Sequence, residues 1–127
     1  MTMILRLMQR YWVALTVLTL LAITLLSLSP MPSLPVVPGT DKTHHFIAYA
    51  ALMFPAAFVR PRYWIALAGV FWLWSGAIEL LQPYVNRYGE WLDMAANGGG
   101  IVCGIVLAMV ARYIVGHFTD RHAARNR

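Results

Sequence analysis

The chain has 127 residues, of which 60% are hydrophobic and 12% are charged, and its formal net charge is +5. Soluble domains carry roughly 25% charged residues, and the apolar residues here form long blocks. The composition therefore excludes an ordinary soluble domain and predicts an integral membrane protein. The basic residues lie between the apolar blocks and near the chain ends, so no nucleic-acid partner is expected. Cys103 is the only cysteine, which excludes an intramolecular disulfide and a thiolate metal cluster.

The first two predicted spans lie on either side of a proline-rich segment. Residues 11–28 form the first apolar run, which is longer than the roughly 7–15 residues of a signal-peptide core, so an uncleaved helix is predicted. Residues 29–40 contain four prolines and predict an extended external linker, because proline lacks an N–H group and restrains its neighbour. The second span is predicted over 41–59, about 28 Å long at 1.5 Å per residue, with Thr40 or Asp41 as its N-cap.

The last two predicted spans flank the most polar stretch of the chain. The third span is expected over 63–82 and ends at Pro83, and the fourth is expected over 93–115. Residues 116–127 are predicted to form a frayed basic tail. Small residues recur every four positions along the fourth span: Ala96, Gly100, Gly104 and Ala108. Such a stripe lets another helix approach closely, and we expect it to pack within the chain, with contact in a homo-oligomer as the alternative.

Lysine and arginine predict the orientation of the spans. Eight of the ten lie in the N-terminal segment, the second loop or the tail, and Lys42 and Arg87 are the other two. Positive residues are retained in the cytoplasm, so both termini are predicted to be cytoplasmic. The predicted fold class is all-α, a single integral-membrane domain built as a four-helix bundle.

With that orientation, the polar residues of the last three spans fall at the outer face. Helical spacing places them on three stripes. The second span carries Lys42, His45 and Tyr49; the third carries Ser75, Glu79 and Gln82; the fourth carries Asp93, Asn97, Gly100 and Gly104. The three stripes are expected to face one another, because polar groups facing lipid would be left unpaired.

The order of these residues resembles the VanZ-like family of small bacterial membrane proteins. The pattern is D-K-x-x-H-F-x-x-Y, then E-x-x-Q, then R-x5-D-x3-N-x2-G-x3-G, and it runs from Asp41 to Gly104 over three of the four spans. Tyr88-Gly89-Glu90 stands where small and polar residues are commoner. The resemblance implies a multi-pass protein of the bacterial cytoplasmic (inner) membrane. The family is named for a member linked to glycopeptide resistance, a property not transferred to this chain.

The polar stripes have two non-enzymatic interpretations. In the structural one, Glu79 pairs with Arg87 or Lys42, and Asp93 caps the fourth helix and bonds Asn97. In the binding one, membrane lipids are the partners, and an anionic lipid-linked envelope precursor is held by its phosphate on Lys42 and Arg87. The predicted ligand-binding residues are Lys42, His45, Tyr49, Glu79, Gln82, Arg87, Asp93 and Asn97.

The third interpretation is an enzyme acting on a lipid phosphate or glycolipid. Glu79 would be the general acid or base, with His45 as its partner, and Asp93 is a further catalytic candidate. No serine or cysteine nucleophile lies beside a plausible base, which argues against acyl-enzyme chemistry. No cofactor or metal site is predicted, because the adjacent His44 and His45 point about 100° apart on a helix.

Overall fold

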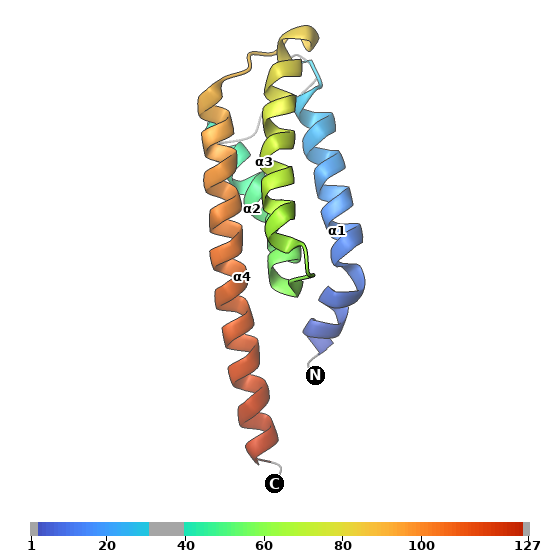
Figure 1. Ribbon diagram of the computed structural model, residues 1–127, viewed down its shortest axis with the longest axis vertical. Helices are drawn as coiled ribbons and strands as arrows, with labels where there is room; N and C mark the ends of the chain where they lie inside the picture. Colours follow the sequence, from blue (N-terminus) through green and yellow to red (C-terminus); the bar gives the residue numbers. More distant parts are fainter. Residues whose placement is uncertain (1–2, 31–39, 126–127) are drawn as a thin grey trace.

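The computed structural model describes residues 3–30 and 40–125, and these residues form helices and no strand (Figure 1). The elements are α1 (Met3–Ser27), α2 (Asp41–Val59), α3 (Trp64–Leu81), the short 3-10 helix η2 (Gln82–Val85) and α4 (Trp91–Arg125). The all-α class and the four predicted helices are therefore confirmed. The predicted linker lies largely outside the described residues.

Local signals explain the bounds of α2, which match the prediction. The Oγ1 of Thr40 accepts a hydrogen bond from the Thr43 N–H at 3.2 Å, so Thr40 is the N-cap. At the other end Arg60 adopts a left-handed conformation, with φ at 55°, and its N–H donates to the Ala56 carbonyl. That turn closes the helix immediately before Pro61.

The prediction of a frayed tail is wrong over the described residues. Helix α4 begins at Trp91 and continues without a break to Arg125, ten residues beyond the predicted end. No proline interrupts this segment, and the rings of Tyr113 and His117 stack one turn apart with centroids 6.1 Å from each other. Helix α1 likewise starts earlier than predicted, at Met3 rather than residue 11.

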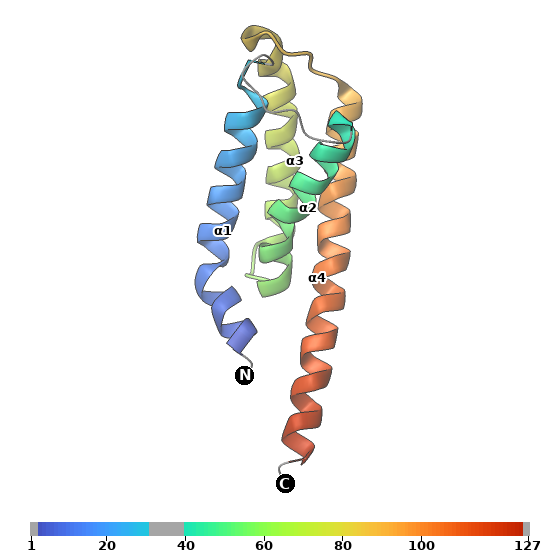
Figure 2. The same cartoon turned by 180° about the vertical axis from the view of Figure 1, so that it is seen from behind.

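Helix α2 lies between the other helices and is packed most closely against α4 (Figure 2). Three members of the predicted small-residue stripe make this contact: Gly100, Gly104 and Ala108 are buried, whereas Ala96 is half-buried. A Cβ atom at Gly100 would collide with the carbonyl oxygen of Phe46, and one at Gly104 would lie 2.5 Å from the carbonyl oxygen of Ala50. The stripe thus packs within the chain, as predicted, and brings the backbones of α2 and α4 together.

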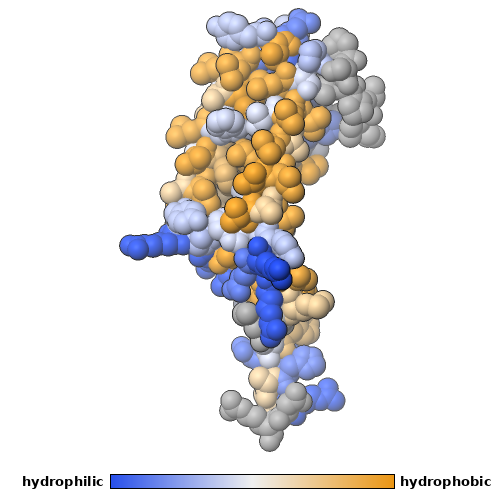
Figure 3. Space-filling model, turned by 90° about the vertical axis from the view of Figure 1, so that its right-hand side faces the viewer, coloured by the Kyte–Doolittle hydropathy of each residue, from blue (hydrophilic) through white to orange (hydrophobic). Residues whose placement is uncertain are grey.

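Three helices are long and apolar enough to cross a membrane, namely α1, α3 with η2, and α4. Their outward side chains are largely apolar, and Figure 3 shows hydrophobic residues covering most of one face, with hydrophilic residues gathered below and along the projecting end of α4. Helix α2 falls short of the same apolarity because Lys42, His44 and His45 occupy its first turns. The chain is therefore a membrane protein, and a fourth span over α2 stays a prediction.

The C-terminal end of α2 is tied to α4 by a side chain. Arg112 donates a hydrogen bond through Nη1 to the carbonyl oxygen of Phe58, one of the last residues of α2. Carbonyl groups in the last turn of a helix have no partner within the helix, so a cation there is favourable. In the sequence Arg112 contributes only to the predicted orientation of the spans. In the structure its side chain also satisfies a carbonyl group at the C-terminal end of α2.

Candidate functional site

The site lies at the end of the molecule opposite the start of α1 and the end of α4. There the first turns of α2 and α4 meet the last turns of α3 (Figures 1 and 2). We call the side chains gathered here the polar cluster; its members are Lys42, His45, Glu79, Glu90, Asp93 and Asn97. The predicted convergence is confirmed for one residue of each stripe, since a side-chain nitrogen or oxygen atom from each of His45, Glu79 and Asp93 lies within 4.8 Å of the other two.

Lys42 is the one cation that the described contacts place in the polar cluster. Its Nζ lies 3.0 Å from Oε2 of Glu90 and 3.7 Å from Oδ1 of Asp93. The side chains of Lys42 and Glu90 are about half exposed, whereas that of Asp93 is only 8% exposed. Lys42 and Glu90 therefore form the solvent-exposed rim of the polar cluster, and Asp93 lies buried inside it.

His45 is oriented by a buried amide. Its Nδ1 lies 3.0 Å from Oδ1 of Asn97, a residue of α4 that is 1% exposed. Because the amide oxygen can only accept, Nδ1 is the donor in this contact, and in the neutral ring Nε2 then carries the lone pair. Tyr49, one turn further along α2, is buried in the core below the polar cluster.

Glu79 faces the polar cluster and not lipid, but its partner differs from the predicted cations. Its Oε2 accepts a hydrogen bond from the backbone N–H of Glu90 at 3.0 Å. The loop before α4 passes directly over Glu79, and a Cβ atom at Gly89 would collide with the Glu79 carbonyl oxygen. A glycine at position 89 is what allows this close passage.

Two carboxylate oxygens of the polar cluster have no hydrogen-bond partner among the described residues. They are Oε1 of Glu79 and Oδ1 of Asp93, and both atoms are shielded from solvent. Buried polar atoms are nearly always hydrogen-bonded. With three carboxylates against one ammonium, the polar cluster also has a formal charge of −2 when His45 is neutral. It therefore has a surplus of acceptors and of negative charge.

Gln82 and Arg87 bind α1, at the edge of the polar cluster. Nε2 of Gln82 donates to the Ser27 carbonyl at 3.2 Å, and Nη1 of Arg87 lies 3.4 Å and 3.5 Å from the carbonyls of Leu26 and Ser29. These bonds and that of Arg112 we call the helix-end contacts. No hydrogen bond or ion pair within the described residues joins Gln82 or Arg87 to the polar cluster.

Glu90 is the member of the polar cluster that sequence reasoning missed. It belongs to no helical stripe, because it lies in the loop immediately before α4. The only signal was its place in an otherwise apolar chain, three residues before Asp93. Ser75, by contrast, lies on the predicted stripe but is fully buried and donates to the Trp72 carbonyl at 2.6 Å.

Comparison with protein-family models, with curated proteins and with solved structures finds no match to this chain. An imidazole with a free Nε2, two unpaired carboxylate oxygens and a half-exposed ammonium group can bind hydroxyl groups, cations and, at the rim, a phosphate.

Proposed function

We propose that the chain is a VanZ-like protein of the bacterial inner membrane, and that it binds the polar head group of a lipid-linked envelope component at the polar cluster. Its helices would form a membrane-embedded four-helix bundle with both termini in the cytoplasm and the polar cluster at the outer face. The observation that carries this proposal is a pair of shielded carboxylate oxygens without a hydrogen-bond partner, Oε1 of Glu79 and Oδ1 of Asp93, the second of which has only its 3.7 Å ion pair with Lys42. A cluster with only a structural role would be expected to satisfy its own acceptors.

The rim of the polar cluster could bind a head group that carries both hydrogen-bond donors and a phosphate. Sugar hydroxyls would donate to the carboxylates of Glu79 and Asp93. Lys42, already about half exposed, would turn from Glu90 towards the phosphate. Arg87 uses only Nη1 in its bonds to α1, so its remaining N–H groups could serve a second phosphate oxygen.

Exposed aromatic residues at the same end of the molecule support a position at the membrane surface. Tyr84, Tyr88 and Trp91 are 86%, 89% and 76% exposed and lie in η2 or in the loop up to the start of α4. Tyrosine and tryptophan are enriched where a membrane meets water. These three side chains would lie beside the head group of a lipid whose chain stays in the bilayer.

An enzyme acting on a lipid phosphate or glycolipid is the second candidate. The observation that favours it is the fixed orientation of His45, because a base must be held in one tautomer to accept a proton. Turnover of a candidate lipid by the purified protein, lost in His45→Gln, would select the enzyme over the binder.

The test of binding is mass spectrometry of the lipids that stay with the purified protein. We expect a polyprenyl phosphate or glycolipid to be enriched over its share of the membrane extract, and Asp93→Asn to lose that enrichment. Asp120→Asn, a matched change on the exposed end of α4, should retain it. Recovery of bulk phospholipids alone, in the ratio of the membrane, would contradict the proposal.

The proposed orientation has its own test. The start of α1 and the end of α4 lie at the same end of the molecule (Figure 1), opposite the polar cluster. A phosphatase fused after Arg127, which is active only outside the cytoplasm, should therefore be silent. Activity of that fusion would place the polar cluster on the cytoplasmic side.

A further inference from the structure

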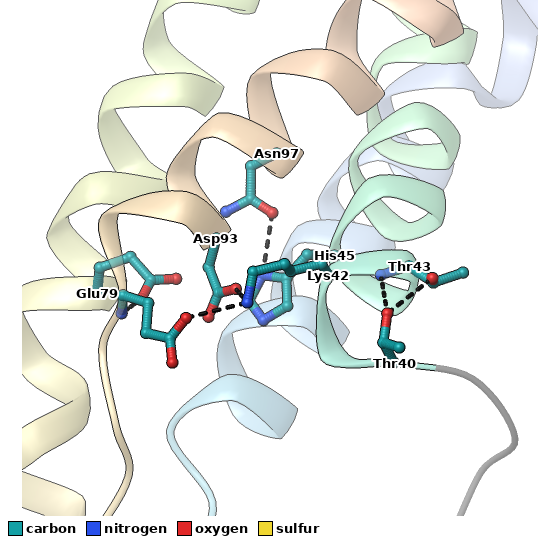
Figure 4. Close-up of polar contacts among 8 residues, drawn as sticks. Thr40, Lys42, Thr43, His45, Glu79, Asp93 and Asn97 are labelled. Atoms are coloured by element: carbon teal, nitrogen blue, oxygen red, sulfur yellow. Dashed lines mark hydrogen bonds and ion pairs between the residues drawn. The ribbon is translucent and has the colours of Figure 1, made fainter.

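We propose that His45, Glu79 and Asp93 bind a divalent transition-metal ion of the Zn²⁺ class between α2, α3 and α4. Figure 4 shows the three side chains, each from a different helix, pointing towards a common space. One ligand atom from each lies within 4.8 Å of the other two. An ion at the centre of a triangle of that size would be about 2.8 Å from each atom, against about 2.0–2.2 Å for zinc bound by nitrogen and oxygen. Closing the difference takes less than about 1 Å of side-chain movement.

The unpaired oxygens are the second observation that points to an ion. Asp93 is 6% exposed, yet its Oδ1 accepts no hydrogen bond among the described residues, and Lys42 approaches it only to 3.7 Å. Oε1 of Glu79 is equally shielded and unpaired. Leaving a buried carboxylate oxygen without a partner is costly. A bound cation would satisfy both oxygens at once.

His45 is prepared for metal binding by its neighbour. The Nδ1–H group is engaged by the Asn97 amide oxygen, which leaves the Nε2 lone pair as the ligand. Metal-binding histidines nearly always donate their other N–H in this way, which fixes the ring and raises its basicity. Asn97 would therefore be a positioning residue and not a ligand.

Charge and ligand type select the class of ion. The two positive charges of the ion would cancel the formal charge of −2, while Lys42 keeps its 3.0 Å contact with Glu90. One imidazole with two carboxylates is compatible with zinc and also with manganese, whereas magnesium and calcium prefer oxygen ligands alone. Three protein ligands leave one position of a tetrahedral zinc open, where a water molecule or a ligand oxygen can bind. The ion would take the oxygens of Glu79 and Asp93 that the proposed function gives to sugar hydroxyls, so a head group would then bind at the open position of the ion and at Lys42.

The experiment is metal titration of the purified, delipidated protein in detergent after treatment with EDTA. We expect Zn²⁺ to bind at about one ion per chain and to raise the unfolding temperature, because an ion bound to the native state alone stabilises it. Asp93→Asn, Glu79→Gln and His45→Gln should each abolish this binding. Asn97→Leu should weaken it by roughly 10- to 100-fold, the usual cost of losing the group that orients a ligand.

The control is His122→Gln, which removes an exposed histidine near the end of α4 and should keep the full stoichiometry. Should a ligand variant fail to fold, the Co²⁺ absorption spectrum of the wild type still reports a nitrogen- and oxygen-bound site. The proposal is overturned if the stripped wild type takes up no zinc, or if the three ligand variants bind zinc as the wild type does. Because the lipid is removed before the titration, neither of these outcomes tests whether the protein binds a lipid head group.

Discussion

The helix-end contacts and the polar cluster are built from the same kinds of residue but are satisfied to different degrees. The helix-end contacts all run from a side chain to a backbone carbonyl at the end of a helix, and their donors are Arg112, Arg87 and Gln82. Each bond therefore satisfies a carbonyl oxygen that has no partner within its helix. In the polar cluster, three carboxylates share one ammonium, and Oε1 of Glu79 and Oδ1 of Asp93 accept no hydrogen bond among the described residues. Oε1 of Gln82 in the helix-end contacts also lacks a hydrogen-bond partner, but it carries no charge, so the two regions differ chiefly in the surplus negative charge of the polar cluster. Stability is therefore expected to depend on the helix-end contacts, and binding on the polar cluster.

Arg112→Met should have the largest effect on stability. It removes the donor to the carbonyl of Phe58, a residue only 2% exposed, and leaves that oxygen without its partner. An unsatisfied buried acceptor costs about 1–3 kcal/mol of unfolding free energy. Unfolding in mixed detergent micelles measures the loss, and Arg112→Lys should recover part of it. An unchanged unfolding curve would mean that the contact contributes nothing.

Arg87→Met should cost less, because its two bonds to α1 are long and partly exposed. Loss of hydrogen bonds to the carbonyls of Leu26 and Ser29 is expected to lower the unfolding free energy by about 0.5–1.5 kcal/mol. Protease sensitivity around Ser29 should rise with it, since the end of α1 then keeps the hydrogen bonds from Gln82 to Ser27 and from Trp74 to Thr24 but loses those from Arg87. A variant that lost lipid binding at full stability would instead place Arg87 in the site.

Glu90→Gln should give a still smaller change. Its partner Lys42 is about half exposed, and ion pairs at the surface contribute little after solvent screening. We expect a small drop in unfolding temperature that disappears as the salt concentration rises. A drop that persists in high salt would show that the pair is less accessible to solvent than its geometry indicates.

Asp93→Asn should leave stability almost unchanged in the metal-free protein while binding is lost. The substitution keeps the shape of a residue that is 6% exposed but removes one of three crowded negative charges. Residues held in place for a ligand often reduce stability, so their removal costs little. If the polar cluster were purely structural, breaking a buried ion pair would cost about 3–5 kcal/mol. Asp120→Asn is the matched control on the exposed part of α4.

The sequence predicted those features that local chemistry decides. Thr40 caps α2 through its own hydroxyl, so the start of that helix could be placed correctly. The stripes of α2, α3 and α4 were predicted to converge because buried polar groups need one another, and they do.

The partners within the site could not be predicted. Glu90 lies in a loop, where no helical periodicity predicts the direction of a side chain. Arg87 was expected beside a phosphate, but its position relative to the end of α1 is set by the packing of helices far apart in sequence. The continuation of α4 to Arg125 could not be predicted from the basic composition of residues 116–127, because a basic segment can be helical or frayed.

The burial of α2 has a consequence for how the protein is made. This helix has polar first turns and packs most closely on α4, and the Asn97 that bonds His45 lies 52 residues further along the chain. While α2 leaves the ribosome, α1 has already been synthesised and α4 has not. The polar start of α2 is then poorly suited to lipid. Its final position requires packing against Gly100 and Gly104 of α4. The contact between α2 and α4 can therefore form only after α4 has been synthesised.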